Sequence, residues 1–359
     1  MTFPLEKEKY KLINEVGFGP HSNVYEALCT ENSQRVCVKK INLIEFPFNT
    51  RSLQAVLATW NKNNCPYILE YYGSFIDGEY MWIIQEFMDA GSLIDLINKS
   101  FPNGCKNEKL CAAIAHNVLK SLSYFHSNNR NHCNLKASNV LFNHKGEIKL
   151  SDFNISTSIV QTGKIRQSLI SMNNDVIYLA PEILNNGTYS SKSDIWSFGL
   201  LMLNLANGHH PYEGIKVMEA VVKIMNNDSP SLNDDFSPEF KEFIAGCLDK
   251  NPVTRLSADE LLQHKFLQNI EPNQLASFLH FSHTPEVQVD HAQKPERHGR
   301  FLITRKPSME IIADEAYQTE HQLNAEITLL TEEVERLEEE NRKLIEGFNE
   351  VMRQIKSLA

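Results

Sequence analysis

The sequence predicts an α+β protein that ends in a long coiled-coil helix, and three patterns along the chain support this prediction. Apolar and polar residues alternate over 10–41, as in antiparallel strands separated by turns. Over 110–125 the apolar residues recur at helical spacing, and from Leu323 onward they follow a heptad. With 359 residues and a hydrophobic content of 42%, the chain is long enough for one large domain and a tail.

Composition argues against several classes of protein. The net charge is −10, and residues 326–346 alone contribute −5, from eight glutamates and three basic residues, which makes a nucleic-acid partner unexpected. Seven single cysteines, without a C-x-x-C pair or a metal-ligand cluster, indicate reduced thiols in a cytoplasmic protein, with the nucleus as the alternative. The sequence contains no run of 18 apolar residues, so we expect neither a membrane span nor secretion.

The turn between the first two predicted strands is a candidate nucleotide-binding loop. Its sequence GFGPHSNV places Gly17, Gly19 and Val24 at the spacing of the G-x-G-x-x-G-x-V loop of protein kinases, which it resembles. Glycine lets backbone amides approach phosphates because it has no Cβ. Ser22 replaces the third glycine and Pro20 removes an amide donor, so we expect fewer hydrogen bonds to a nucleotide. A plain hairpin turn is the alternative for so short a fragment.

A lysine closes the next predicted strand, whose residues VCVK resemble the V-A-I-K strand of kinases. The resemblance implies that Lys39 contacts the α and β phosphates of ATP, whereas an exposed lysine at a strand end is the alternative. Kinases hold this lysine with a glutamate on the following helix. Here that position falls on Val56, and the helix predicted over 52–60 contains no acidic residue. We therefore expect Lys39 to lack its usual ion-pair partner.

The strand predicted over 80–88 leads into a hinge. By resemblance to kinases, the backbone of Glu86 and Met88 faces the adenine ring, and the polar Gln85 beside them is compatible with nucleotide binding. The small lobe that this resemblance implies covers about 10–88, and the large lobe about 89–267.

A catalytic-type loop without its proton acceptor follows the long predicted helix. The residues NHCNLKASN at 131–139, and SDFN after them, resemble the H-R-D-L-x-x-x-N loop and the D-F-G turn of kinases, and the 18 residues from Asn134 to Asp152 match their spacing. Asn134 takes the place of the aspartate that accepts the proton of the substrate hydroxyl, and a neutral amide cannot accept it near neutral pH. By resemblance, Lys136 faces the phosphates, while Asn139 and Asp152 are the Mg²⁺ ligands.

Three further departures from the kinase pattern fall on chemistry. Cys133 replaces the arginine that reads a phosphorylated activation loop, and Asn154 replaces the glycine of D-F-G. Asp175 stands where kinases have the threonine that hydrogen-bonds the catalytic lysine, so we expect it to pair with Lys136 and neutralise it.

By contrast, the residues that hold the fold match the kinase pattern. The segments APE, SDIWSFG and NPVTRLSA occur in order and contain Glu182, Asp194 and Arg255. The resemblance implies a buried bidentate ion pair between Glu182 and Arg255, and contact of Asp194 with the catalytic-loop backbone. Over 10–267 the chain is identified as a member of the two-lobed eukaryotic protein kinases. It is most similar to the Sterile-20 group of serine/threonine kinases, in a plant branch related to oxidative-stress-responsive and blue-light-signalling kinases.

Two parts make up the predicted tail, a linker over 268–319 and a coiled coil over 320–358. The linker contains four prolines and many polar residues. Its residues RFLI at 300–303 resemble a docking peptide of oxidative-stress-responsive kinases, with a chance match as the alternative, and Ser308 follows basic residues as in a phosphorylation site.

The heptad of the predicted coiled coil indicates a protein partner. Branched residues fill most a positions, leucine fills most d positions, and Asn341 occupies one a position, which favours a parallel two-stranded coiled coil. A helix that folds back on the kinase domain is the alternative. Glu333 would face Glu338 of an identical chain, so we expect a helix with basic e and g residues to pair better than a second copy. An active Sterile-20-type kinase is the candidate partner.

Three functional hypotheses remain open at this point. The first is a pseudokinase that acts as a signalling scaffold or allosteric partner, with weak or absent binding of ATP and Mg²⁺. The second is a weakly active ATP-dependent protein serine/threonine kinase. The third is a dimerisation adaptor without catalysis.

Overall fold

In the computed structural model, the described residues are 3–19, 22–44, 57, 65–152, 174–186, 189–268, 270, 296–298 and 301–303, with the backbone alone at 174, 175, 186, 296–298 and 301–303. The chain divides into two compact units, Met1–His283 and Thr284–Ala359. The predictions that concern Pro20, Val56, Asn154, Ser308, the side chain of Asp175 and the coiled coil over 320–358 lie outside the described residues.

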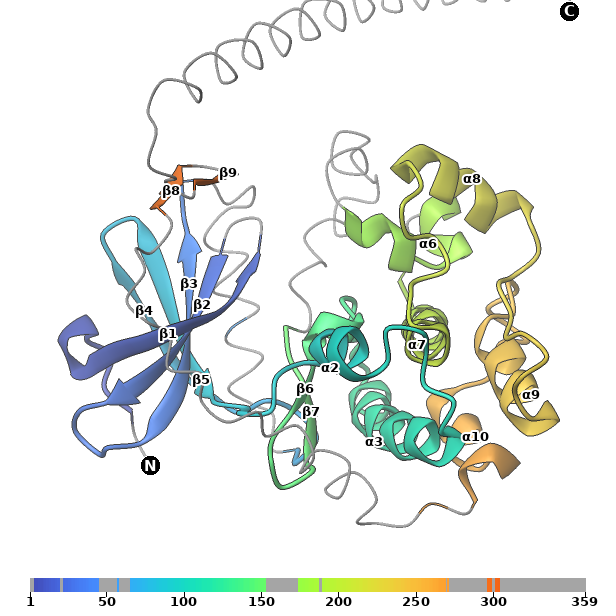
Figure 1. The fold of residues 1–359 in the computed structure, drawn as a ribbon, viewed down its shortest axis with the longest axis horizontal. Helices are drawn as coiled ribbons and strands as arrows, with labels where there is room; N and C mark the ends of the chain where they lie inside the picture. The colour runs from blue at the N-terminus through green and yellow to red at the C-terminus, as the bar shows by residue number, and fades with distance from the viewer. Residues whose placement is uncertain are drawn as a thin grey trace, which may run out of the picture. The chain divides into compact units, whose positions relative to one another are not determined.

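Five antiparallel strands form the small lobe (Figure 1). After the short 3₁₀ helix η1 (Lys7–Lys9) they are β1 (Tyr10–Gly19), β2 (Ser22–Cys29), β3 (Arg35–Asn42), β4 (Tyr71–Asp77) and β5 (Tyr80–Glu86). Their order across the sheet is β1-β2-β3-β5-β4, and each neighbouring pair is antiparallel. The alternating pattern over 10–41 therefore predicted β1, β2 and β3 correctly, and the strand predicted over 80–88 is β5, whereas β4 was not predicted.

The two faces of the sheet have different roles. On one face Val36 and Val38 of β3 are buried with Trp82 of β5. On the other face the register places Lys39 of β3 directly between Val24 of β2 and Ile83 of β5. Side chains that lie opposite one another in neighbouring strands point to the same face. Lys39 is therefore presented on the face opposite the Val36 and Val38 cluster.

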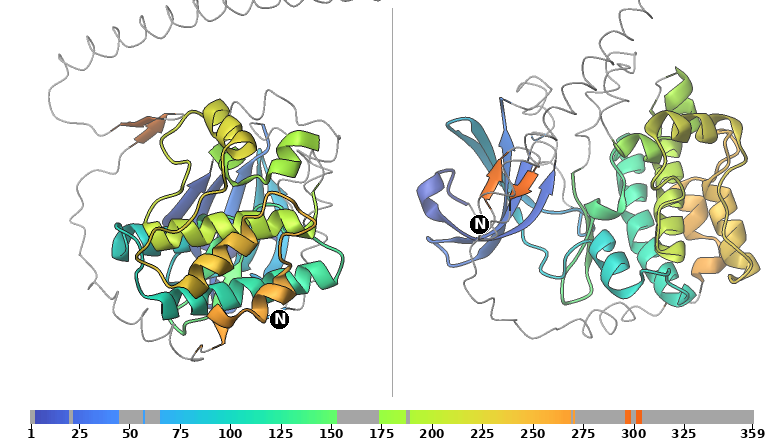
Figure 2. Two further views of the ribbon diagram at one scale, coloured as in Figure 1. Left: turned by 90° about the vertical axis from the view of Figure 1, so that its right-hand side faces the viewer. Right: turned by 45° about the horizontal axis from the view of Figure 1, so that its top comes forward.

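The large lobe is mostly helical (Figures 1 and 2). Its elements are α2 (Leu93–Ser100), α3 (Glu108–Ser127), η2 (Ala137–Asn139), β6 (Val140–Phe142), β7 (Ile148–Leu150), η3 (Asn174–Tyr178), α6 (Pro181–Asn186), α7 (Ser191–Asn207), α8 (Val217–Asn226), α9 (Pro238–Cys247), α10 (Ala258–Leu262) and η4 (Lys265–Leu267). Strands β6 and β7 form an antiparallel pair that carries the loop and turn of interest at its ends.

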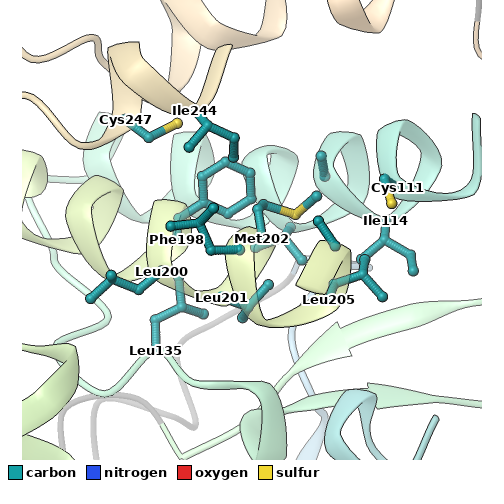
Figure 3. Packing of buried hydrophobic residues seen from close by; sticks show 14 of the residues in the cluster. Cys111, Ile114, Leu135, Phe198, Leu200, Leu201, Met202, Leu205, Ile244 and Cys247 are labelled. Atoms are coloured by element: carbon teal, nitrogen blue, oxygen red, sulfur yellow. The ribbon is translucent and has the colours of Figure 1, made fainter. Parts of the chain in front are cut away.

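Helix α7 lies at the centre of the large lobe. Its residues are buried on all sides, which is the pattern of a core helix and not of an amphipathic surface helix. Figure 3 shows Phe198, Met202 and Leu205 of α7 among side chains of α3 and α9. A side chain that projects from this helix toward the catalytic loop is therefore held on a rigid support.

The C-terminal end of α7 requires glycine. Gly208 follows the helix with φ of +84°, in the left-handed region that glycine adopts at low cost. A Cβ at this position would lie 2.5 Å from the backbone nitrogen of Gly104 and 2.6 Å from the carbonyl oxygen of Pro102. The end of α7 thus packs backbone to backbone against the loop that precedes α3.

The unit Thr284–Ala359 contains a short hairpin that the sequence did not predict. Strands β8 (Glu296–His298) and β9 (Phe301–Ile303) pair antiparallel, within the segment predicted to be linker throughout. In the described part of the chain, none of the helices is long and apolar enough to cross a membrane, and all seven cysteines are unpaired.

Candidate functional site

The catalytic-type loop is held by a buried carboxylate on α7. Asp194, which is 1% exposed, accepts hydrogen bonds from the backbone N–H of His132 at 2.7 Å and of Cys133 at 2.9 Å. Its Oδ2 also lies 2.9 Å from Nε2 of His126. Cys133 has a φ of +63°, which is uncommon for a residue with a Cβ. The bonds from Asp194 stabilise this conformation and so fix the direction of the loop.

Asn134 uses its side-chain amide to join the loop to the turn. Its Nδ2 donates to the backbone oxygen of Asp152 at 3.0 Å, and its own backbone oxygen accepts from Nδ2 of Asn139 at 2.7 Å. A carboxylate at this position could not donate the first of these bonds, because it carries no hydrogen when ionised. The position of the proton acceptor is thus occupied by a residue that acts as a hydrogen-bond donor within the protein.

Lys39 of the small lobe and Asp152 of the large lobe form a direct ion pair. Nζ of Lys39 lies 2.7 Å from Oδ2 of Asp152, and the two side chains are 11% and 21% exposed. Asp152 has a φ of +57°, which turns its carboxylate toward β3. We expected Lys39 to lack a partner because Val56 replaces the helix glutamate. The structure shows instead that the metal-position aspartate takes the place of that partner.

A second ion pair lies at the hinge, between Glu86 and Lys149. Nζ of Lys149, on β7, is 2.8 Å from Oε1 and 2.7 Å from Oε2 of Glu86, at the end of β5. Sequence reasoning assigned Glu86 a backbone role and did not identify Lys149. The only signal was a lysine on a strand close to the turn, which is too common to interpret alone.

The remaining candidates for the nucleotide lie on the small lobe. Gly17 pairs with Val24, and Val24 pairs with Lys39, so the three share one face of the sheet. A Cβ at Gly19 would come within 3.0 Å of Oγ of Ser22, the residue that replaces the third glycine. The described parts of the loop therefore keep an open backbone at Gly17 and have little room between Gly19 and Ser22. Met88, beyond the hinge, is 7% exposed.

Lys136 lies at the N-terminus of η2, beside a cavity of about 20 Å³. The cavity is also lined by Cys133, Asn134, Tyr178 and Tyr189, and it has room for about one water molecule. It separates the catalytic-type loop from the segment that leads into α6. This space is too small for a nucleotide, so the candidate nucleotide site is the face of the sheet that carries Lys39.

ATP and Mg²⁺ fit this site unequally. Gly17, Val24 and the ammonium of Lys39, the groups that the kinase resemblance assigns to the nucleotide, lie on one face of the sheet. For the cation, Asn139 is neutral and Oδ2 of Asp152 is bound to Lys39. The one carboxylate that a Mg²⁺ ion would use here is thus already paired with an ammonium.

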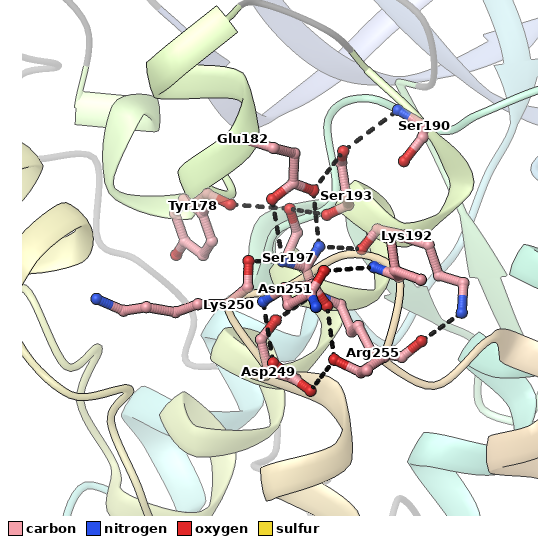
Figure 4. Close-up of polar contacts among 12 residues, drawn as sticks. Tyr178, Glu182, Ser190, Lys192, Ser193, Ser197, Asp249, Lys250, Asn251 and Arg255 are labelled. Atoms are coloured by element: carbon pink, nitrogen blue, oxygen red, sulfur yellow. Dashed lines mark hydrogen bonds and ion pairs between the residues drawn. The ribbon is translucent and has the colours of Figure 1, made fainter.

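The scaffold residues form one buried polar cluster beneath the site (Figure 4). Arg255 is 0% exposed and binds Glu182 through Nη1 at 2.7 Å and Nη2 at 3.0 Å. It also donates to the backbone oxygens of Lys192 and Asp249, each at 2.7 Å. Ser193 donates to the same carboxylate of Glu182 at 3.0 Å. This cluster fixes α6 and the start of α7 to the loop that precedes α10.

Two buried histidines make stability depend on pH. Nδ1 of His132 accepts the N–H of Asn134, and Nδ1 of His210 accepts the N–H of Tyr212, each at 3.2 Å. Burial lowers the pKa of both imidazoles from 6.5 to about 4. The unfolded chain then binds more protons than the folded chain between these two pH values. Stability is therefore lost as the pH falls through this window.

Lowering the pH from 7 to 5 should reduce the free energy of unfolding by about 4 kcal/mol through the two histidines together. Urea denaturation at the two pH values measures the change. His210→Asn, whose amide oxygen can still accept the Tyr212 N–H, should remove about half of the pH dependence. An unfolding midpoint that is the same at both pH values would contradict the prediction.

Comparisons with known proteins agree with this architecture. The family model described as protein kinase domain matches residues 10–267. The serine/threonine-protein kinase sid1 of Schizosaccharomyces pombe is 31% identical over 74% of this chain and 55% of its own length. The serine/threonine-protein kinase ppk11 of the same yeast is 34% identical over 75% of this chain and 85% of its own. Mitogen-activated protein kinase kinase 1 of Arabidopsis thaliana is 37% identical over 73% and 75%.

These relatives differ in length, and the chain spans only about half of sid1. The match to the kinase family model nevertheless covers both lobes, from β1 to the end of η4. With its five-stranded small lobe and its helical large lobe, the chain belongs to the protein kinase domain family, among the Sterile-20-like serine/threonine kinases.

Proposed function

We propose that this protein is a pseudokinase of the Sterile-20-like group, which acts by association as a scaffold or allosteric partner and not by efficient phosphoryl transfer. The observation that carries the proposal is the position of Asn134, whose amide donates to the backbone of Asp152. No carboxylate replaces it among the described loop residues, because 132–142 contain no acidic side chain.

The missing base has a calculable effect on rate. General base catalysis contributes about 10²–10⁴-fold, and each 1.4 kcal/mol of lost transition-state stabilisation lowers the rate about tenfold. The pairing of Asp152 with Lys39 should lower the rate further. In an active kinase the aspartate binds the cation and the lysine binds the phosphates, whereas here the two bind each other. Slow residual transfer by positioning alone is the second hypothesis, a weakly active kinase.

Phosphate transfer to a generic protein substrate tests the proposal, with Asp152→Ala as the control. We expect no transfer above the rate of that control. Transfer by the original chain that is absent from the Asp152→Ala variant would establish a weakly active kinase instead. Thermal unfolding with and without ATP separates the remaining hypotheses: a shift supports a nucleotide-binding pseudokinase, and its absence supports the dimerisation adaptor.

Asn134→Asp alone should leave phosphate transfer within about tenfold of the original chain. The new carboxylate could not donate a hydrogen bond to the backbone oxygen of Asp152. Its own negative oxygen would then face that carbonyl oxygen, and the two would repel. The substitution would also leave Lys39 bound to Asp152 and Val56 in place of the helix glutamate. The same transfer assay measures the outcome, and a rise of several hundredfold from this single change would disprove the expectation.

The partner and the compartment are also part of the proposal. We infer that the heptad over 320–358 binds a protein helix with basic flanking residues, with an active Sterile-20-type kinase as the candidate. Sedimentation equilibrium of the full chain distinguishes this from a tight homodimer. Seven free thiols support a reducing compartment, the cytoplasm or the nucleus. Phosphorylation of Ser308 would add a binding site for an arginine-rich reader of phosphoserine.

A further inference from the structure

We propose that this protein binds nucleoside triphosphates without a divalent cation. The inference rests on the proposed pseudokinase function and adds the form of ligand that its site selects, the free triphosphate anion. The observation that leads to it is the ion pair of 2.7 Å between Lys39 and Asp152, the one carboxylate that the family pattern leaves at the metal position.

The carboxylates near Lys39 in the described residues are already matched by lysines of the protein. Asp152 is paired with Lys39, and both oxygens of Glu86 are paired with Lys149. Asn134 and Asn139 are neutral. The sequence also lacks acidic residues over 46–69, where the helix glutamate of kinases would lie. Among the described residues, a divalent cation would therefore find no unpaired negative charge beside Lys39.

A cation and a triphosphate would affect the Lys39–Asp152 pair in opposite ways. A divalent cation bound to Asp152 would lie close to the ammonium of Lys39, and like charges repel strongly where solvent is scarce. A triphosphate instead brings oxygens to the same ammonium, which has three N–H donors and gives one of them to Asp152. The site can therefore accept phosphate without first being neutralised by metal.

The nature of Mg²⁺ strengthens this difference. Mg²⁺ gives up water reluctantly and needs near-octahedral oxygen ligands. Of the two residues at the metal positions, Asn139 has its Nδ2 bound to the backbone oxygen of Asn134, which leaves a single neutral oxygen. Together with a carboxylate already bound to Lys39, this is a weak pair of ligands. The absence of the cation should consequently have little effect on affinity.

A fluorescent, ribose-labelled ATP analogue titrated into the full chain tests the inference, once in excess EDTA and once in excess magnesium chloride. The two dissociation constants should agree within about threefold. Binding that is tenfold or more tighter with magnesium would overturn the inference, and so would the lack of binding in both solutions.

The substitution Asp152→Asn gives opposite results for the two kinds of site. If the carboxylate only competes with phosphate for Lys39, its removal should tighten binding in EDTA by about threefold or more. If it is a metal ligand, the same change should weaken binding in magnesium. Lys39→Met should abolish binding in both solutions. Thermal unfolding of each variant shows whether it is folded.

Asp77→Asn is the matched control for this substitution. Asp77 is also paired with a lysine, Lys7, at 2.9 Å, but the pair is exposed and contains neither Lys39 nor Asp152. The control should leave both dissociation constants unchanged. Phosphate transfer by the original chain would disprove the proposed function and not this inference, whereas strict dependence on magnesium would disprove the inference and leave the pseudokinase proposal intact.

Discussion

Arg255→Met should lower the free energy of unfolding by about 3–5 kcal/mol. The guanidinium is fully buried and binds both oxygens of Glu182 as well as the backbone oxygens of Lys192 and Asp249. Methionine fills a similar volume but leaves Glu182 as a largely buried charge, with Ser193 as its one remaining side-chain donor among the described residues. Urea denaturation of the full chain at neutral pH measures the loss.

Two variants separate this effect from an unspecific one. Lys241→Met removes an ion pair with the exposed carboxylate of Asp234, and it should lower the free energy of unfolding by less than about 1 kcal/mol. Glu182→Gln combined with Arg255→Met removes the unpaired charge, so the double variant should be more stable than Arg255→Met alone. If Arg255→Met and Lys241→Met lower the free energy of unfolding by the same amount, the buried cluster does not stabilise the fold.

Asp194→Ala should lower the free energy of unfolding by about 3 kcal/mol, and its structural effect should be largest in the catalytic-type loop. The change leaves the N–H groups of His132 and Cys133 without their acceptor in a buried place, and it removes the partner of His126 Nε2. The left-handed conformation of Cys133 then loses its support. Hydrogen exchange should accelerate most at the amides of His132 and Cys133.

Asp259→Ala serves as the comparison for this variant. Asp259 on α10 accepts one hydrogen bond, from Oγ of Ser123, at an exposed position. Its loss should cost less than about 1 kcal/mol and should leave amide exchange in the catalytic-type loop unchanged. Unaltered exchange at His132 and Cys133 in the Asp194→Ala variant would show that the loop does not depend on this carboxylate.

The sequence predicted those parts of the molecule that depend on local pattern. Alternation over β3 placed Val36 and Val38 on one face and Lys39 on the other, because the side-chain period of a strand is fixed by its backbone. The two-lobed fold also followed from motif order, since each motif occupies a set element of the kinase family. For the same reason the pattern indicated that Glu182 and Arg255 lie close to one another, and they do.

The partners of the charged residues could not be predicted in the same way. Lys39 and Asp152 are 113 residues apart, and the family pattern gave Lys39 a glutamate on the helix instead. Once Val56 occupies that position, the tertiary structure alone decides which carboxylate is nearest. The pair of Glu86 and Lys149 joins a strand of the small lobe to a strand of the large lobe, and no local spacing reports such a contact.

The two ion pairs that cross between the lobes affect how the molecule moves. Lys39–Asp152 and Glu86–Lys149 each join a residue of the sheet to a residue that follows or lies on β7. A swing of the small lobe about the hinge would have to separate Lys39 from Asp152, and Glu86–Lys149 ties the hinge itself to β7; each pair is more than three-quarters shielded from water. Salt screens such contacts poorly. The interlobe angle should therefore persist at high ionic strength, and a protein that recognises this surface would meet the same shape whether or not the nucleotide site is filled.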